Sequence, residues 1–153
     1  MERIELAKPA DFDVVAGLAR QVHDLHVQWR PDIFLATETP LPRGTYFELL
    51  EREGIYVLRR NYTVLAYAVV SIQEMDLPVL VPRRVWKLEE LCVDANFRRQ
   101  GLGSQFLNGL MELARQAGCT DLQLTCDPHN QAGRALYESL GMQIKAIQYQ
   151  RKL

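Results

Sequence analysis

A run of two arginines and two glycines, set between a strand-like segment and an amphipathic helix, constrains this chain more than any other feature. Residues 98–104 read Arg-Arg-Gln-Gly-Leu-Gly-Ser. Gly101 and Gly103 allow a tight backbone turn and let the main chain approach a ligand with no Cβ in the way. The helix that follows offers unpaired N–H groups and the positive end of its dipole. The stretch therefore predicts an anion site that favours a pyrophosphate, with Arg98 and Arg99 adding positive charge at its mouth.

The size and charge of the chain narrow the classes of protein it can be. Its 153 residues predict a single domain over 1–153, large enough to bury a core. Apolar residues make up 48% and charged residues 24%, as in an ordinary globular protein. The formal charge of −1 argues against a general nucleic-acid or membrane-surface binder, because such proteins usually carry a basic excess.

The cysteines and the N-terminus bear on the compartment. Cys92, Cys119 and Cys126 are odd in number and form no C-x-x-C pair, which is typical of a reducing environment. The first residues are charged and lack the apolar core of a signal peptide. No apolar run approaches the roughly 18 residues of a transmembrane helix. We therefore expect a cytoplasmic location and no membrane partner.

Hydrophobic periodicity predicts the element order β-α-α-β-β-β-α-β-α-β-β, with Asp11 or Asp13 capping the first helix and Gly118 stopping the third. Strands that first meander and then alternate with helices indicate a mixed sheet covered by helices, α/β or α+β in class. The expected strands cover 2–7, 55–58, 64–72, 85–93 and 122–126, followed by two short strands within 142–152; the helices cover about 11–29, 45–52, 102–117 and 130–140; long loops cover 31–44 and 75–82.

The glycine-rich loop and the strand before it resemble the GNAT superfamily of acyl-CoA-dependent N-acyltransferases. The phosphate loop of that family reads Q/R-x-x-G-x-G/A, and Arg98, Gly101 and Gly103 fill its fixed positions. The family often has a valine five residues before that arginine, and Val93 stands there. A dinucleotide-binding fingerprint would need a third glycine at Phe106, and the Gly-Lys-Ser/Thr of a P-loop does not occur in the chain.

A second motif about 30 residues downstream strengthens the resemblance. The family pattern N-(x)6-Y-(x)3-G-F is matched by Asn130, Tyr137 and Gly141, with Met142 where phenylalanine is usual. The strict motifs cover about residues 85–142, while the first half of the chain matches in element pattern alone. The resemblance implies a GNAT-like mixed, mostly antiparallel central sheet with a splayed parallel strand pair, flanked by about four helices.

The resemblance also implies that acetyl-CoA or another acyl-CoA is the donor. Backbone groups of the strand ending at Val93 would pair with the pantetheine arm like an added strand, and one N–H there would polarise the thioester carbonyl. The loop amides would hold the pyrophosphate. The implied donor-binding residues are Leu91, Cys92, Val93, Arg98, Arg99, Gln100, Gly101, Leu102, Gly103, Ser104, Asn130 and Tyr137.

The acceptor amine must lose a proton before it attacks. An amine of pKa near ~10.4 is only about one part in a thousand neutral at pH 7.4, a deficit of roughly 4 kcal/mol. A carboxylate can remove that proton directly or through water, and Glu89 and Glu90 both lie on the strand that leads to the acyl site. The family position favours Glu89 over Glu90. The alternative is that one or both are solvated strand charges.

Tyr137 and Asn130 each have two interpretations. Tyr137 matches the family tyrosine that can protonate the departing CoA thiolate, and it can also be a core aromatic of a short helix. Asn130 can bond the CoA arm, cap that helix, or do both.

The first helix and the loop after it line the acceptor pocket in the family. This implies substrate-side roles for His26, Trp29, Arg30, Asp32 and Phe34. His23 and His26 share a helix face and could bind a metal, but no third ligand is evident, so we predict no metal site.

The sequence thus predicts a cytoplasmic N-acetyltransferase that moves an acetyl (acyl) group from acetyl-CoA to a primary amine of a small molecule or protein, by direct attack in a ternary complex. The alternative is a non-catalytic CoA-binding sensor or scaffold with the same fold. The family is often dimeric, so a homodimer is possible by analogy, and neither nucleic acid nor membrane is expected as a partner.

Overall fold

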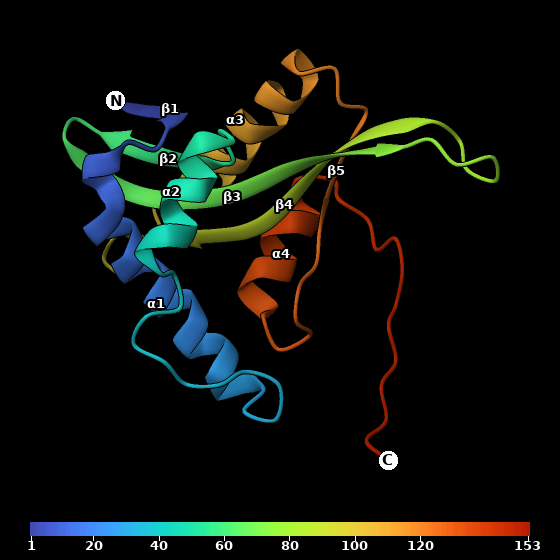
Figure 1. Cartoon of the computed structure of the whole chain (residues 1–153), viewed down its shortest axis with the longest axis horizontal. Coiled ribbons are helices and arrows are strands. Elements are labelled where there is room, and N and C mark those ends of the chain that lie inside the picture. Colours follow the sequence, from blue (N-terminus) through green and yellow to red (C-terminus); the bar gives the residue numbers. More distant parts are fainter.

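The computed structural model describes residues 1–153 and is built on a five-stranded sheet in the order β1-β2-β3-β4-β5 (Figure 1). The first four strands pair antiparallel, and β4 pairs parallel with β5. This confirms the predicted mixed, mostly antiparallel sheet. The strands are β1 (Glu2–Leu6), β2 (Ile55–Arg60), β3 (Thr63–Met75), β4 (Arg83–Val93) and β5 (Asp121–Leu124).

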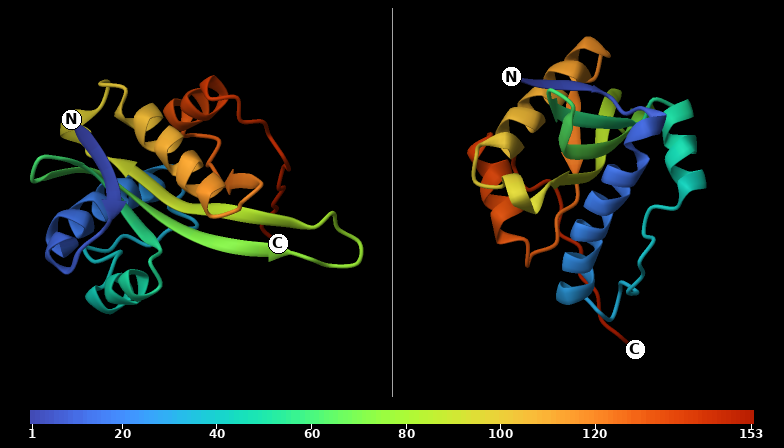
Figure 2. Two further views of the ribbon diagram at one scale, coloured as in Figure 1. Left: turned by 90° about the horizontal axis from the view of Figure 1, so that it is seen from above. Right: turned by 90° about the vertical axis from the view of Figure 1, so that its left-hand side faces the viewer.

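Four α-helices cover the two faces of the sheet, in pairs. Helices α1 (Phe12–Trp29) and α2 (Arg43–Glu51) lie on one face, and α3 (Leu102–Gln116) and α4 (Gln131–Ser139) on the other (Figure 2). Each face has its own apolar core. The α1 side buries Val15, Leu18, Tyr46 and Tyr67, and the α3 side buries Phe106, Leu107, Leu110 and Trp86. None of the helices is both long enough and apolar enough to pass through a bilayer.

The ends of the helices follow local sequence signals with one exception. Gly118 follows α3 with a φ of 79°, the left-handed conformation of a helix C-terminus, as predicted. Asn130 precedes α4, and its side chain accepts the Gly133 N–H at 2.9 Å. The predicted cap of α1 is wrong, because neither Asp11 nor Asp13 makes a side-chain cap bond.

Asp11 is instead one half of a buried ion pair. Its carboxylate accepts two hydrogen bonds from the Arg59 guanidinium, at 3.1 and 2.6 Å, and Arg59 also donates to Glu5 at 2.6 Å. The Asp11 and Arg59 side chains are 9% and 8% exposed. Burial alone would raise the pKa of Asp11, but the Arg59 hydrogen bonds and charge hold it below 3.8. The pair therefore fastens the start of α1 to β1 and β2.

The C-terminal strands predicted within 142–152 are absent. Met142 N–H donates to the Tyr137 carbonyl, and beyond it the chain is extended, exposed and outside the sheet. Two strands need a turn between them, and residues 143–153 contain no Gly, Pro, Asn or Asp to form one.

Removing the Asp11 carboxylate should destabilise the fold. Asp11→Ala leaves the Arg59 charge buried without its partner, so we expect urea unfolding to show a loss of about 3–5 kcal/mol. The exposed Asp13→Ala serves as the control and should stay within about 0.5 kcal/mol of wild type. Because the folded pKa of Asp11 is depressed, the contribution is present above pH 3.8 and is lost as pH falls through the lowered value. If the difference in the free energy of unfolding between Asp11→Ala and wild type stayed the same at lower pH, the assigned role of the Asp11 carboxylate would be contradicted.

Candidate active site

Strands β4 and β5 are paired at one end and apart at the other. The parallel register runs from Val85 opposite Asp121 to Leu88 opposite Leu124, while β4 continues to Val93. From Glu89 to Val93 the edge of β4 on the β5 side therefore has no strand partner. This confirms the predicted splayed pair, and it explains why β5 ends at Leu124 rather than at Cys126.

A β-bulge in β4 lies at the point where the strands part. Glu90 pairs with Val69 and Leu88 with Val70, which leaves Glu89 without a partner on β3. The extra residue shifts the alternation of side chains, so Leu88 and Leu91 both pack in the core beneath α3. The two neighbouring glutamates consequently have different surroundings.

Glu89 is exposed and accepts a hydrogen bond from the Ser71 hydroxyl at 2.9 Å. Glu90 is half-buried and accepts a hydrogen bond from the Tyr67 hydroxyl at 3.0 Å. Burial raises the pKa of Glu90 above 4.5, although the Tyr67 hydrogen bond and the charge of His23 oppose that shift. Of the two predicted candidates, Glu90 has the environment of a base that works nearer neutral pH.

The loop between β4 and α3 is anchored from both sides. The Gln21 side chain, on α1, accepts the Ala95 N–H at 2.9 Å and donates to Asp94 at 3.3 Å. Arg98 Nε donates to the Val93 carbonyl at 3.3 Å, which ties the arginine of the motif back to the end of β4. The loop is thus held against the sheet by groups that lie away from its open side.

The backbone of this loop presents unpaired donors, as the anion-site prediction requires. Arg99 and Gly101 both have positive φ, 64° and 74°, which turns the chain sharply into α3. Gln105 makes the first helical hydrogen bond, to the Gly101 carbonyl, and no side chain caps the helix. The N–H groups of Leu102 to Ser104 therefore have no helical partner, and the dipole adds positive potential.

Gly103 brings α4 close to this helix start. A Cβ at position 103 would lie 3.1 Å from Leu136 Cδ2, so even an alanine would require the Leu136 side chain to shift by a few tenths of an ångström. Tyr137 is the next residue on α4, and it is half-buried in the core beneath α3 and α4. Burial, with a smaller effect of Cys126, raises the pKa of its phenol to about 12. A phenol with that pKa is held as a proton donor at neutral pH.

The five predicted substrate-side residues gather at the C-terminal end of α1. His26 stacks on Phe34 with ring centroids 5.0 Å apart and lies 5.9 Å from Trp29. Arg30 and Asp32 form a bidentate pair at 2.9 and 2.7 Å, which, with some help from other groups, lowers the pKa of Asp32 to about 2.

This cluster lies near the loop that follows β5. Burial and the charge of His23 lower the pKa of His26, while Asp127, in the loop after β5, opposes that shift. Asp127 and His26 therefore lie within electrostatic reach of each other. The His23 Nε2–H donates to the Leu35 carbonyl at 2.7 Å, which fixes the loop after α1 against the helix.

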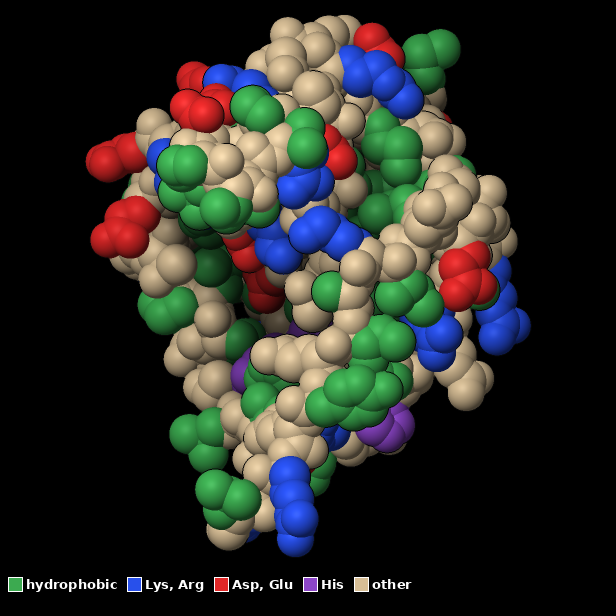
Figure 3. Space-filling model, turned by 90° about the vertical axis from the view of Figure 1, so that its right-hand side faces the viewer, with side chains coloured by type: hydrophobic (Ala, Val, Ile, Leu, Met, Phe, Trp, Pro, Cys, Tyr) green, Lys and Arg blue, Asp and Glu red, His purple; other side chains and the backbone are tan.

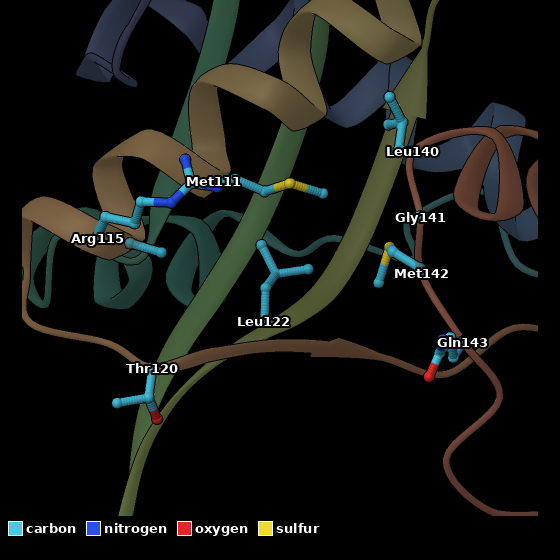
Figure 4. Close-up of a pocket in the computed structure, with 9 residues that line it drawn as sticks. Met111, Arg115, Thr120, Leu122, Leu140, Gly141, Met142 and Gln143 are labelled. Atoms are coloured by element: carbon cyan, nitrogen blue, oxygen red, sulfur yellow. The ribbon is translucent and has the colours of Figure 1, made fainter.

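The surface is hollowed where these parts meet. Acidic side chains lie at the back of the hollow, Lys and Arg side chains lie above them, and histidine lies below (Figure 3). A separate groove of about 310 Å³, lined by both polar and apolar side chains, lies on the α3 side of β5 and contains none of the predicted site residues (Figure 4).

Comparison with known proteins identifies the family of this protein. The model of the acetyltransferase (GNAT) family matches residues 19–142. The chain belongs to this family. The match includes α1 from Ala19 onward, all of α3, the glycine-rich loop and Tyr137.

Two curated GNAT relatives match over part of their length. The chain is 37% identical over 65 residues to a probable glucosamine 6-phosphate N-acetyltransferase 2 of Oryza sativa subsp. japonica, covering 42% of this chain and 37% of that protein. It is 36% identical over 56 residues to a thialysine N-epsilon-acetyltransferase of Bos taurus, covering 37% of this chain and 33% of that protein. The matches thus span only about a third of these relatives.

Solved structures match over nearly the whole chain. A tetramutant of the BH1408 protein from Bacillus halodurans superposes with a TM-score of 0.91 at 26% identity, covering 99% of both chains. The aminoglycoside N-acetyltransferase AAC(6')-Iy, solved in complex with CoA, shares the fold with a TM-score of 0.73 at 17% identity, covering 99% of this chain and 95% of that one. The GNAT fold predicted from the motifs is therefore confirmed.

Sequence reasoning missed two residues that shape the site. Tyr67 has the pattern of a core aromatic, and nothing in the sequence identifies Glu90 as the acceptor of its hydroxyl. Gln21 lies 74 residues from Ala95 and has no motif of its own. Both contacts join segments that are distant in sequence, so neither could be found from local spacing.

The positive φ of Gly101 gives a direct test of the loop geometry. Gly101→Ala has open space for its Cβ but must adopt a left-handed conformation, so we expect a loss of about 1–2 kcal/mol in the free energy of unfolding. Gly17→Ala, in the interior of α1 with equally open space, is the matched control and should gain up to about 1 kcal/mol. Chemical denaturation measures both, and equal effects at the two sites would show that the loop backbone is not constrained.

Proposed function

We propose that this GNAT protein transfers an acetyl group from acetyl-CoA to a primary amine, by direct attack within a ternary complex. The single observation that carries the proposal is the parting of β4 from β5 beside a helix start whose N–H groups lack partners. The unpaired edge of β4 suits an extended amide-containing arm, and the loop suits a diphosphate. Coenzyme A contains both groups, joined in one molecule.

The donor would be held mainly by backbone groups. Leu91, Cys92 and Val93 offer the free edge of β4, and the loop from Arg98 to Ser104 offers amides and positive charge. Asn130 Oδ1 is already used in the cap of α4, so only its amide nitrogen is free to meet the donor. The thioester supplies the acyl group, and an N–H near Val93 would stabilise the charge that develops on its carbonyl oxygen.

Glu90 is the group that we assign to deprotonate the amine. Burial raises the pKa of Glu90, which favours its acting as a base, whereas Glu89 is exposed and accepts the Ser71 hydrogen bond. The Tyr67 hydroxyl holds one of its oxygens. This reverses the preference for Glu89 that the family position gave, because the bulge separates the two side chains.

Tyr137 is the group that we assign to protonate the leaving thiolate. Its pKa of about 12 keeps the phenol protonated at neutral pH, and its helix packs against the start of α3 through Gly103. The nearby Cys126 thiol has a pKa raised by burial, so it stays protonated and is a poor nucleophile. This supports direct transfer over an acyl-cysteine route.

The acceptor would enter between the C-terminal end of α1 and the loop after β5. Glu90 and Asp127 give this side negative charge, and His26, Trp29 and Phe34 give it flat apolar surface. Both relatives are named as N-acetyltransferases, one of glucosamine 6-phosphate and one of thialysine, and both of these compounds are amines. These relatives support an amine as the acceptor of this protein. Its cytoplasmic location remains a prediction.

The transferase proposal is tested by thiol release from acetyl-CoA with a panel of primary amines. We expect turnover with at least one amine and micromolar CoA binding by calorimetry. Tyr137→Phe should lower kcat by about 10-fold or more while leaving CoA affinity within about threefold. Tight CoA binding with no turnover for any amine, and no effect of the Tyr137 change, would identify a CoA-binding sensor or scaffold. Failure to bind CoA at millimolar ligand would contradict both the transferase and the sensor or scaffold hypothesis.

The choice of base is tested by a matched pair of substitutions. Glu90→Gln keeps an oxygen for the Tyr67 hydroxyl but cannot take a proton, so kcat/KM at pH 7 should fall by about 10²-fold or more. The loss of kcat/KM in Glu90→Gln should become smaller as the pH approaches the pKa of the substrate amine, because the amine is then deprotonated without a base. In the wild-type enzyme, kcat/KM should fall on the acid side at a pH above 4.5. Burial raises the pKa of Glu90, and only the ionised Glu90 carboxylate can accept a proton.

Glu89→Gln is the control and should stay within about threefold of wild type at every pH. A larger loss for Glu89→Gln than for Glu90→Gln would assign the base to the exposed residue.

A further inference from the structure

The loop of residues 94–101 has a defined shape, although little of it is packed against the rest of the protein. Residues 95–96 and 98–101 are exposed, and Phe97 packs against the core beneath α3. Arg99 has a φ of 64°, a left-handed conformation that a residue with a side chain keeps only where its surroundings impose it. Contacts with other segments are therefore needed to hold the loop in this shape.

Gln21, on α1, makes such a contact with two hydrogen bonds. Its side-chain oxygen accepts the Ala95 N–H at 2.9 Å, and its amide nitrogen donates to Asp94 Oδ1 at 3.3 Å. The same Asp94 oxygen accepts the Asn96 N–H at 3.0 Å and so caps the short 3₁₀ turn of residues 95–97. One glutamine therefore engages both the backbone and the capping side chain of the residues that open the loop.

The restraints on either side of this contact do not replace it. The Asp94 N–H donates to the Leu65 carbonyl at 2.8 Å, so the chain stays bonded to β3 only as far as Asp94. Arg98 Nε donates to the Val93 carbonyl at 3.3 Å, but this bond joins two residues of the same segment. From Asp94 to Arg98, Gln21 is the only side chain of another element that forms a hydrogen bond with the loop.

Gln21 projects from a helix that is itself firmly placed. Leu18, one turn earlier on α1, is buried in the core of that face of the sheet. The start of α1 is fastened to β2 by the buried pair of Asp11 and Arg59. The glutamine is half-buried, so its position is set by the packed helix rather than by the exposed loop.

We propose that Gln21 is a positioning residue for the acyl donor, and that it holds this loop in the shape that binds the diphosphate of coenzyme A. The inference rests on the proposed function, because it takes coenzyme A as the ligand of the loop. The free N–H groups of Leu102 to Ser104 converge on an anion only while the residues before them keep this turn. A loop that samples other shapes binds its ligand with an affinity reduced by the fraction of molecules in the competent one.

A neutral amide suits both partners of Gln21. The Ala95 N–H needs an acceptor and the Asp94 carboxylate needs a donor, and the glutamine side chain offers one of each. A glutamate could still accept from Ala95, but it would place a second negative charge against Asp94 and near the diphosphate. Methionine has a similar length and flexibility, but it can form neither bond with comparable strength.

Calorimetry with CoA on the full-length Gln21→Met variant tests the proposal without any need for turnover. We expect the Kd for CoA to rise about fivefold or more, because the loop loses its anchor from α1. Methionine is as good a helix former as glutamine, so the Tm should stay within about 4 °C of wild type. Gln28→Met is the matched control, because Gln28 is an exposed glutamine of the same helix, and its Kd should stay within about twofold of wild type.

Two further measurements distinguish positioning from a general loss of structure. Without ligand, Gln21→Met should speed hydrogen exchange at the amides of residues 95–104 and leave residues 105–116 of α3 unchanged. With an amine that supports turnover, the KM for acetyl-CoA should rise while kcat stays within about twofold, because Gln21 does not contact the reacting groups.

Gln21→Glu provides a second variant in case Gln21→Met folds poorly. It should also weaken CoA binding, because its charge opposes both Asp94 and the diphosphate. A Kd within about twofold of wild type in both Gln21 variants would overturn the role of Gln21 and leave the proposed function intact. Equal losses in Gln21→Met and Gln28→Met, or a fall in kcat with an unchanged KM, would also overturn it. Wild-type protein that does not bind CoA would instead contradict the proposed function, and this inference with it.

Discussion

The arrangement of this protein depends on the incomplete pairing of β4 with β5. Strand β4 is bonded to β3 along its length, which fixes it firmly, yet β5 follows it only from Val85 to Leu88. Beyond Leu88, β4 has one unpaired edge although it is not an outer strand of the sheet. The bulge at Glu89 lies at the same place and turns Glu90 to the α1 side, next to the point where the β5 pairing ends. The features that we propose for the donor and for the acceptor are consequently a few residues apart.

The two apolar cores divide the site between them. The α3 and α4 side holds the glycine-rich loop and Tyr137, joined by the close approach at Gly103. The α1 side holds Tyr67 and the aromatic cluster around His26, with the start of α1 fastened by Asp11 and Arg59. The sheet between them carries Glu90. Each part of the proposed chemistry is therefore supported by a different packing unit.

The sequence predicted the parts of this molecule that are encoded locally. The loop from Arg98 to Ser104, the Asn130 cap and the Gly118 helix end are set by glycine conformation and short-range hydrogen bonds, and all three were found. The contrast between the surroundings of Glu89 and Glu90 was not predicted, because it depends on how β4 is registered against β3. The Asp11 pairing with Arg59 was missed for the same reason, and the two C-terminal strands were wrong because alternation alone does not supply a partner.

The separate cores on the two faces of the sheet have a consequence for divergence. His26 and Phe34 stack on each other at the end of α1, whereas Leu102 and Tyr137 pack in the core on the other face of the sheet. The acceptor preference of such a chain can therefore drift, or be redesigned, while the handling of the donor is inherited unchanged.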